Sequence, residues 1–225
     1  MKQDIISVDI ETAPRLDLVK DFYPYNKSKV AYGNAKTPEA RKKAEDKHKE
    51  SWFPKLNAKA ALNPVTAEVC AIGYKTADSK NLDIRPSEMD MIKGFWSIYL
   101  DIKKGAMGRK AICGWNIFGF DLPFMIKRSW ILGLDVPAGV TNGRYHDLIF
   151  KDIKQEYHRH EYGWEKMDGL EFVAKVLGCQ SPRTGNVKGK DFYKLLNTTT
   201  DDLKKAEEYL SADVTECYNI AQVVL

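Results

Sequence analysis

No stretch of this sequence is apolar for long enough to cross a membrane as a helix. The longest apolar run, AICGWNIFGFDLPFMI, is interrupted by Asp121 and Pro123 and falls short of the roughly 20 residues that a spanning helix needs. A predicted strand also begins almost at Met1, which leaves no room for the charged and apolar segments of a cleaved signal peptide. These absences predict a soluble protein that does not bind membranes.

The sequence also lacks paired cysteines and internal repeats. Its 4 cysteines are scattered without a CxxC spacing, and each lies in an apolar segment where a thiol packs as a small hydrophobic group. This pattern is typical of buried free thiols in a reducing compartment, so we expect a cytoplasmic location and assign the cysteines no chemistry.

At 225 residues, the chain is long for one domain and short for two. We predict a single α/β domain over residues 1–225, with a basic, partly helical insertion at about 15–62. The insertion carries 12 Lys or Arg against 6 Asp or Glu, an excess larger than the +4 of the whole chain. It is either an arm that follows the phosphates of a nucleic acid or a soluble surface helix within TPEARKKAEDKHKESWF.

Hydrophobic periodicity and turn residues predict the other elements. Strands are expected at about 3–10, in EVCAIGYKT and NLDIRP as a hairpin across ADSK, in KAICGW and in RYHDLIF. Helices are expected from Ser87 to about 103, from a cap at Asp121 to about Gly133, in DGLEFVAKVLG up to Gly178, and from TTTDD onward.

The first predicted strand carries two carboxylates on one face. In IISVDIET, Asp9 and Glu11 are two residues apart and point to the same side, while Val8 and Ile10 face the other layer. Two adjacent carboxylates in a partly dry site repel each other unless a cation neutralises them. Oxygen ligands suit Mg²⁺ or Mn²⁺, so the pair predicts a metal site, and the alternative is a polar strand end that only aids solubility.

Two further acidic residues lie at informative places. Asp121, in NIFGFD, follows a buried strand at the start of a helix, where it is either a metal ligand or a helix cap. Asp213 lies beside the apolar face of the last helix, with Tyr209 one turn earlier on the same side. No salt-bridge spacing or capping position explains Asp213, which indicates a partner elsewhere.

Together, the three segments resemble the three motifs of the DEDD, or DnaQ-like, 3′–5′ exonucleases: D-x-E, N-x-x-x-F-D and Y-x-x-x-D. The second motif, within GWNIFGFDLPFMIKRSWILGL, and the later MDGLEFVAKVLG are similar to stand-alone exonucleases related to the proofreading domains of family B DNA polymerases. The histidine subfamily has His five residues before the last aspartate, where this chain has Glu208, and Tyr209 follows it as in the tyrosine subfamily. We therefore expect His146, His158 and His160 to lie on the surface or in loops.

The resemblance implies a ribonuclease-H-like α/β fold, with a mixed sheet of about five strands flanked by helices. It implies hydrolysis of single-stranded or frayed DNA 3′ ends to nucleoside monophosphates with two divalent ions, Mg²⁺ or Mn²⁺. In this scheme Asp9 bridges both ions, and Glu11 and Asp213 hold the ion that activates water. Asp121 holds the second ion. Tyr209 orients the water through its hydroxyl, since a phenol with a pKa near 10 stays protonated at pH 7.

Contacts to the nucleic acid are expected from two places. Asn116 is a candidate hydrogen-bond partner of the terminal nucleotide, and Phe120 or Phe124 is a candidate stacking group, although Phe124 is equally compatible with the core. The loop PRTGNVKGK supplies positive charge for the phosphate backbone. Its basic candidates are Arg183, Lys188 and Lys190.

Two alternatives stay open. The same carboxylates serve RNA exonucleases, and no residue pattern reads a 2′-hydroxyl, so a 3′–5′ exoribonuclease is the nearest rival. A nucleic-acid-binding module that kept the fold without the chemistry is the other. The sequence departs from the family in its long insertion and in YLSAD, which lacks the acidic residue that often precedes the last aspartate. Neither departure removes an expected ligand.

Overall fold

The computed structural model describes residues 4–84, 87–105, 110–140, 149–159, 168–182, 187–196 and 198–225. The chain divides into two compact units. The sheet unit comprises Met1–Thr12 and Val69–Leu225, and the basic unit comprises Ala13–Glu68. In the described part of the chain, every helix is too short or too polar to span a membrane.

The sheet unit is built on a five-stranded mixed sheet with the strand order β3-β2-β1-β4-β5. The strands are β1 (Asp4–Pro14), β2 (Ala67–Lys75), β3 (Lys80–Ile84), β4 (Lys110–Gly114) and β5 (Phe150–Asp152). β1 pairs in parallel with β4, which pairs in parallel with β5, whereas β2 and β3 form the predicted antiparallel hairpin. The carboxyl ends of β1 and β4 therefore share one edge of the sheet, where open α/β sheets bind their ligands.

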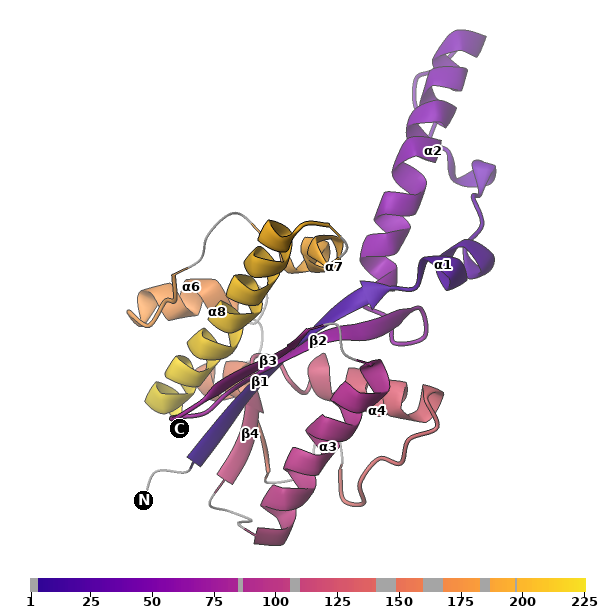
Figure 1. Cartoon of the computed structure of the whole chain (residues 1–225). Coiled ribbons are helices and arrows are strands. Elements are labelled where there is room, and N and C mark those ends of the chain that lie inside the picture. Colours follow the sequence, from indigo (N-terminus) through magenta and orange to yellow (C-terminus); the bar gives the residue numbers. More distant parts are fainter. Residues whose placement is uncertain are drawn as a thin grey trace. The chain divides into compact units, whose positions relative to one another are not determined.

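Helices cover both faces of this sheet (Figure 1). α3 (Glu88–Gly105) and α4 (Asp121–Ile131) lie on one face, and α6 (Leu170–Val176) and α8 (Thr200–Val224) lie on the other. The remaining helices are α5 (Ile153–Tyr157), the 3₁₀ turn η2 (Gly189–Asp191) and α7 (Phe192–Leu195). Between α5, α6, α8 and the sheet lies a core cluster of Ile5, Cys113, Ile153, Val173, Ala174, Cys217, Ile220 and Ala221.

A buried ion pair fixes α4 against α3 and β2. Arg128 is 2% exposed, and its Nη2 lies 2.7 Å from Glu88 Oε2 while its Nε donates to Glu88 Oε1 at 2.8 Å. Glu88 Oε1 also accepts the backbone N–H of Val69 at 2.8 Å. Because these bonds compensate for burying both charges, the pair holds α4, and with it Asp121, in a fixed position at the edge of the sheet.

The basic unit is mainly helical. It contains α1 (Leu16–Phe22), the 3₁₀ turn η1 (Lys27–Lys29) and α2 (Pro38–Ala60), which is the helix predicted in this region. Thr37 caps α2, since its Oγ1 accepts the N–H of Ala40 at 3.2 Å. The assignment of residues 15–62 as an insertion within one domain of residues 1–225 stays a prediction.

Three sequence-based details are revised by the structure. Asp121 is not the cap of α4 but its first residue, because the N-cap is Phe120 and no side-chain cap bond forms. β1 runs to Pro14 rather than to about residue 10. The strand predicted in RYHDLIF meets β5 (Phe150–Asp152) only at Phe150, and residues 144–148 lie outside the described residues. All cysteines are free thiols, as expected, and only Cys179 is more than slightly exposed.

Candidate active site

Three acidic side chains converge at the carboxyl end of β1. One carboxylate oxygen from each of Asp9, Glu11 and Asp213 lies within 4.8 Å of the others. Asp9 and Glu11 share one side of β1, as the alternation of side chains along a strand predicts. Asp213 reaches them from α8, where it lies on the buried side of the helix at 8% exposure.

Asp121 comes to the same place from α4. Its Oδ1 accepts the backbone N–H of Ile10 at 3.2 Å, the residue between Asp9 and Glu11. The side chain is 5% exposed. The Asp121 carboxylate is therefore tied directly to β1, which explains why it does not cap its own helix.

The turn before Asp121 is held by an acidic residue that the sequence did not single out. Asp152, at the end of β5, is 2% exposed and accepts the N–H of Asn116 at 3.2 Å and that of Phe118 at 3.1 Å. It also accepts the N–H groups of Lys154 and Gln155 in the first turn of α5. Asp152 thus connects the NIFGFD turn to β5. Its only sequence signal is an acid at a strand-to-helix junction, KDI.

Asn116 occupies a strained part of this turn. Its φ is 64°, a left-handed conformation that asparagine tolerates better than most residues. Its side chain covers Gly119, where an added Cβ would lie 2.5 Å from the Asn116 Oδ1. The small residue at 119 therefore allows the side chain at 116 to lie flat against the turn.

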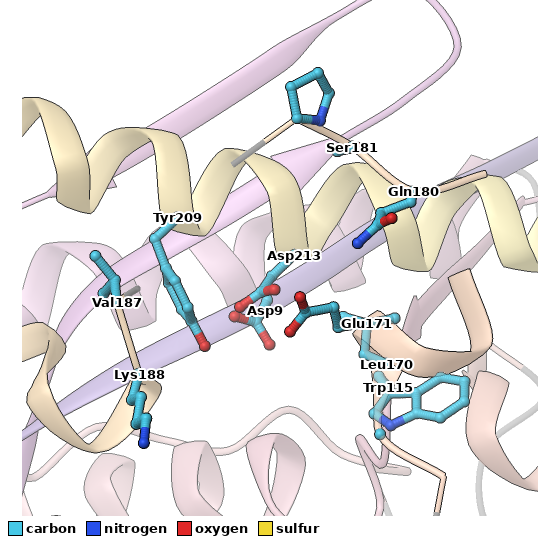
Figure 2. A pocket seen from close by; sticks show the side chains of 12 residues that line it. Asp9, Trp115, Leu170, Glu171, Gln180, Ser181, Val187, Lys188, Tyr209 and Asp213 are labelled. Carbon is cyan, nitrogen blue, oxygen red and sulfur yellow. The ribbon is translucent and has the colours of Figure 1, made fainter. Parts of the chain in front are cut away.

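Tyr209 lies one turn before Asp213 and beside it (Figure 2). The tyrosine hydroxyl and the Asp213 carboxylate are hydrogen-bonded. The turn η2 approaches the same hydroxyl, since a Cβ added to Gly189 would lie 3.2 Å from it. The ring is also in contact with Phe192, at 6.0 Å between centroids. The phenol is thus confined between α8 and the residues that precede α7.

The acidic cluster opens into a cavity of about 1100 Å³. Its lining residues are Asp9, Trp115, Gly169, Leu170, Glu171, Gln180, Ser181, Pro182, Val187, Lys188, Tyr209 and Asp213. Figure 2 shows the Glu171 carboxylate pointing toward Asp9 and Asp213 from α6, and Lys188 on the same side of the cavity as Tyr209. One wall is anchored by the buried Glu216, whose Oε1 accepts the N–H of Ser181 at 3.0 Å.

The predicted nucleic-acid contacts are distributed unevenly. Lys188 lines the cavity, and Lys190 is exposed on η2. Phe120 is half-buried and in ring contact with Phe124, which is 2% exposed and belongs to the core. Of the two roles left open for Phe124, the core is therefore favoured. Arg183 lies outside the described residues.

Other cavity residues were not expected from the sequence. Trp115 directly precedes the N-x-x-x-F-D motif, and this position could have identified it. Glu171 and Gln180 belong to no motif that could have identified them. His158, expected on the surface or in a loop, follows α5 in a turn, but its side chain is buried, with Nε2 3.8 Å from Asp168 Oδ2. His146 and His160 lie outside the described residues.

Burial and the repulsion between neighbouring carboxylates raise the pKa values of the ionisable groups in the site. Burial, followed by the charges of Asp213 and Asp121, raises the pKa of Glu11 well above its usual range. Burial raises the pKa of Asp121 to about 7 against the opposing bond from Ile10. The pKa of Tyr209 is raised by burial and by the neighbouring carboxylates, so its hydroxyl keeps its proton at neutral pH.

These properties fit a divalent cation. Oxygen atoms that bind one Mg²⁺ are at most about 4.2 Å apart, twice a bond length of about 2.1 Å. The 4.8 Å cluster of Asp9, Glu11 and Asp213 is within about 0.6 Å of that spacing, so it would need to contract slightly around one ion. A cation also removes the repulsion that raises the carboxylate pKa values, and an all-oxygen donor set suits Mg²⁺ or Mn²⁺.

The sequence matches no family model and no curated protein. The structure is similar to that of the family B DNA polymerase from the hyperthermophilic archaeon Pyrobaculum calidifontis, with a TM-score of 0.65 and 17% sequence identity. The match covers 99% of this chain and 24% of the polymerase chain, so this protein spans about a quarter of that length. At this identity the likeness shows the fold alone. The predicted ribonuclease-H-like α/β fold, with its mixed five-stranded sheet flanked by helices, is confirmed.

Proposed function

We propose that this protein is a metal-dependent 3′–5′ exonuclease that hydrolyses terminal phosphodiesters of DNA. The observation that carries the proposal is the convergence of Asp9, Glu11 and Asp213 within 4.8 Å, with Asp121 bonded to the strand between the first two. The three segments that supply them are far apart in the sequence and match, in order, the motifs of the tyrosine subfamily of DnaQ-like exonucleases. The likeness to a DNA polymerase supports a nucleic acid as the substrate.

In this proposal, Asp9, Glu11, Asp121 and Asp213 hold two divalent ions, Mg²⁺ or Mn²⁺. When bound, such ions lower the pKa of a water molecule and stabilise the charge of the leaving oxygen. The carboxylates supply the negative charge that selects divalent over monovalent cations. Their burial keeps bulk water from competing for the site.

Tyr209 positions the attacking water. Its hydroxyl is held by Asp213 and confined by Gly189, and its raised pKa keeps it protonated, so it orients the nucleophile rather than accepting its proton. The water oxygen forms a bond to phosphorus as the bond to the 3′-oxygen of the preceding nucleotide breaks. The products are a nucleoside 5′-monophosphate and a strand with a new 3′-hydroxyl.

The cavity residues around the acids then bind the terminal nucleotides. Lys188 lines the same cavity as Tyr209, and its ammonium is a candidate partner of a backbone phosphate (Figure 2). Trp115 offers an aromatic ring on the opposite side of the cavity, and base stacking on such rings does not depend on sequence. These roles extend the predicted contacts at Asn116 and Phe120.

The test is digestion of matched single-stranded DNA and RNA oligonucleotides labelled at the 5′ end, with Mg²⁺ and with Mn²⁺. A 3′–5′ exonuclease shortens the labelled strand one nucleotide at a time, whereas a 5′ exonuclease releases the label at once. The Asp9→Ala variant is expected to abolish the ladder. Activity on RNA alone would identify the exoribonuclease, and binding without hydrolysis would replace the proposal with a nucleic-acid-binding module. Unchanged digestion by Asp9→Ala would point to a contaminating nuclease.

A further inference from the structure

The start of the basic unit interleaves lysines with aromatic residues. The segment Lys20–Lys36 reads KDFYPYNKSKVAYGNAK and contains one acidic residue, Asp21. Its lysines are Lys20, Lys27, Lys29 and Lys36, and its aromatic residues are Phe22, Tyr23, Tyr25 and Tyr32. We refer to this stretch as the aromatic-lysine segment. Such a pattern suits a single-stranded nucleic acid, because cations bind its phosphates and aromatic rings stack on its bases.

The aromatic-lysine segment is fixed against α2 at one end by Glu45. The Glu45 carboxylate pairs with Lys27 at 2.8 Å and accepts the Tyr32 hydroxyl at 2.8 Å. Arg41 lies over the Tyr32 ring, 5.9 Å from its centroid, and its Nε donates to the carbonyl of Ala35 at 3.3 Å. The segment therefore has a defined conformation although it contains little regular structure.

A second set of contacts holds the middle of the segment. The Tyr25 ring lies 5.6 Å from His48 and 5.7 Å from Trp52 between centroids. Lys29 lies over the Trp52 ring at 5.8 Å. The half-buried rings of Tyr25, His48 and Trp52 support the segment. Lys29 stays exposed although it contacts the Trp52 ring.

The rings that this support leaves in solvent are Phe22 and Tyr23. Phe22 is 64% exposed and Tyr23 is 44% exposed, at the end of α1. Lys20, Lys29 and Lys36 are exposed in the same segment. Large exposed aromatic rings are costly in water, and together with unneutralised lysines they mark a binding surface rather than a solubilising one.

One face of α2 has a balanced charge, in contrast to the aromatic-lysine segment. There, Lys42, Lys43 and Lys47 are interspersed with the same number of acidic residues. The acidic residues are Glu39, Asp46 and Glu50. This face is balanced in charge and suits a solvated helix.

We propose that the aromatic-lysine segment binds single-stranded nucleic acid, with Phe22 and Tyr23 stacking on bases and the lysines contacting phosphates. A duplex hides the faces of its bases in its own stack, so the segment prefers single strands. The inference adds a binding surface to the proposed exonuclease and rests on the basic unit alone.

The test uses the full chain carrying Asp9→Ala, in EDTA, so that the probe is not consumed. Binding of a fluorescent oligothymidylate is measured by anisotropy over a range of salt concentrations. The pair Phe22→Ser and Tyr23→Ser is expected to weaken binding at least about tenfold, since both stacking contacts with bases are lost. The triple Lys20→Gln, Lys29→Gln and Lys36→Gln is expected to reduce the salt slope by about 2, at roughly 0.7 for each phosphate contact.

The matched control removes the same charge from the balanced face, with Lys42→Gln, Lys43→Gln and Lys47→Gln, and is expected to change binding little. The inference would be overturned if the two lysine triples lost equal affinity or if loss of both rings left wild-type affinity. It would also be overturned if the protein bound a duplex as tightly as a single strand, or bound anionic vesicles but not oligonucleotides. Circular dichroism verifies the fold of every variant. If binding depends on the segment but the wild-type protein hydrolyses no oligonucleotide with Mg²⁺ or Mn²⁺, the exonuclease is refuted and this surface stands. If the wild-type protein hydrolyses oligonucleotides but binding does not depend on the segment, this inference is refuted and the exonuclease stands.

Discussion

The two units use charge in opposite ways. In the sheet unit, Glu11, Asp121 and Asp213 are at most 8% exposed, and burial raises the pKa values of the first two. In the basic unit, the charged residues face solvent, and the hydrogen bond from Lys27 lowers the pKa of Glu45. Buried charges of one sign are costly until a partner neutralises them, whereas exposed charges are screened within about 10 Å.

The difference teaches where specificity arises. Like charges that are held together and shielded from water favour the binding of a small cation in a defined geometry. Exposed lysines attract any polyanion without fixing its geometry, so they need the aromatic rings for selectivity. We therefore expect substitutions in the sheet unit to change hydrolysis and those in the basic unit to change binding.

The largest effect is expected from Asp213→Asn. Loss of one carboxylate from the cluster would remove a proposed metal ligand, which is worth several kcal/mol in the transition state, or about 10³-fold in kcat/KM. The measurement is hydrolysis of a labelled oligonucleotide together with Mn²⁺ titration by calorimetry. The matched control, Asp201→Asn, removes an exposed acid from the first turn of the same helix and is expected to leave both values unchanged. Similar losses in the two variants would show that overall charge, not the cluster, matters.

A second contrast is the pH dependence of stability in the metal-free protein. Asp121 has a pKa of about 7 in the folded chain against an ordinary value of 3.8, so the folded state holds its proton more tightly. Between pH about 4 and 7, unfolding releases this proton, and the free energy of unfolding falls as pH rises, by at most about 1.4 kcal/mol per pH unit. Denaturant titrations in EDTA are expected to show a shallower fall in Asp121→Asn.

The control for this dependence lies in the basic unit. Glu45 has a lowered pKa, so it stabilises the folded state at higher pH and loses that contribution as pH falls through its folded pKa, below 4.5. Glu45→Gln therefore leaves the fall between pH about 5 and 7 unchanged. Adding Mg²⁺ is expected to flatten the wild-type curve. A wild-type curve that rises with pH across this window would contradict the assignment of Asp121.

Tyrosines of the two units provide the third contrast. Tyr209→Phe removes the hydroxyl next to Asp213, and we expect kcat to fall about 10- to 100-fold with little change in KM, because positioning rather than binding is lost. Tyr32→Phe removes a hydroxyl that is bonded to Glu45 in the basic unit and leaves kcat unchanged. Steady-state kinetics separate the two. A loss of kcat as large as that of Asp213→Asn would instead indicate that the phenol takes part in proton transfer.

Much of the sheet unit was predictable because its signals are local. The ADSK hairpin follows from turn residues, and α8 begins after Thr199, whose Oγ1 accepts the N–H of Asp202 at 3.2 Å, as the acidic first turn predicts. The grouping of Asp9 with Glu11 follows from strand alternation. That Asp213 joins them was inferred from a family resemblance, since no local rule relates residues about 200 positions apart.

What the sequence did not reveal depends on contacts made after the chain folds. A helix cap was one of the two roles expected for the Asp121 carboxylate, but the carboxylate instead accepts the N–H of Ile10, 111 residues away. The sequence did not predict that the Asp152 carboxylate accepts hydrogen bonds from four backbone N–H groups. In the basic unit the charge excess was evident, whereas the exposure of Phe22 and Tyr23 required the structure.

The smallest effect is expected at Gly189, which lies next to the hydroxyl of Tyr209. A methyl group at Gly189 would lie 3.2 Å from the Tyr209 hydroxyl, a contact that displaces the phenol by a few tenths of an ångström. Since a misplacement of about 1 Å costs on the order of 10²-fold, Gly189→Ala is expected to lower kcat severalfold, less than Tyr209→Phe. Gly94→Ala, in α3 with no neighbour within 4 Å of the added methyl group, is the control. It is expected to raise the melting temperature slightly, because alanine favours a helix over glycine, without changing kcat. If Gly189→Ala had full activity while a crystal structure showed the hydroxyl displaced, the position of Tyr209 would not limit the reaction.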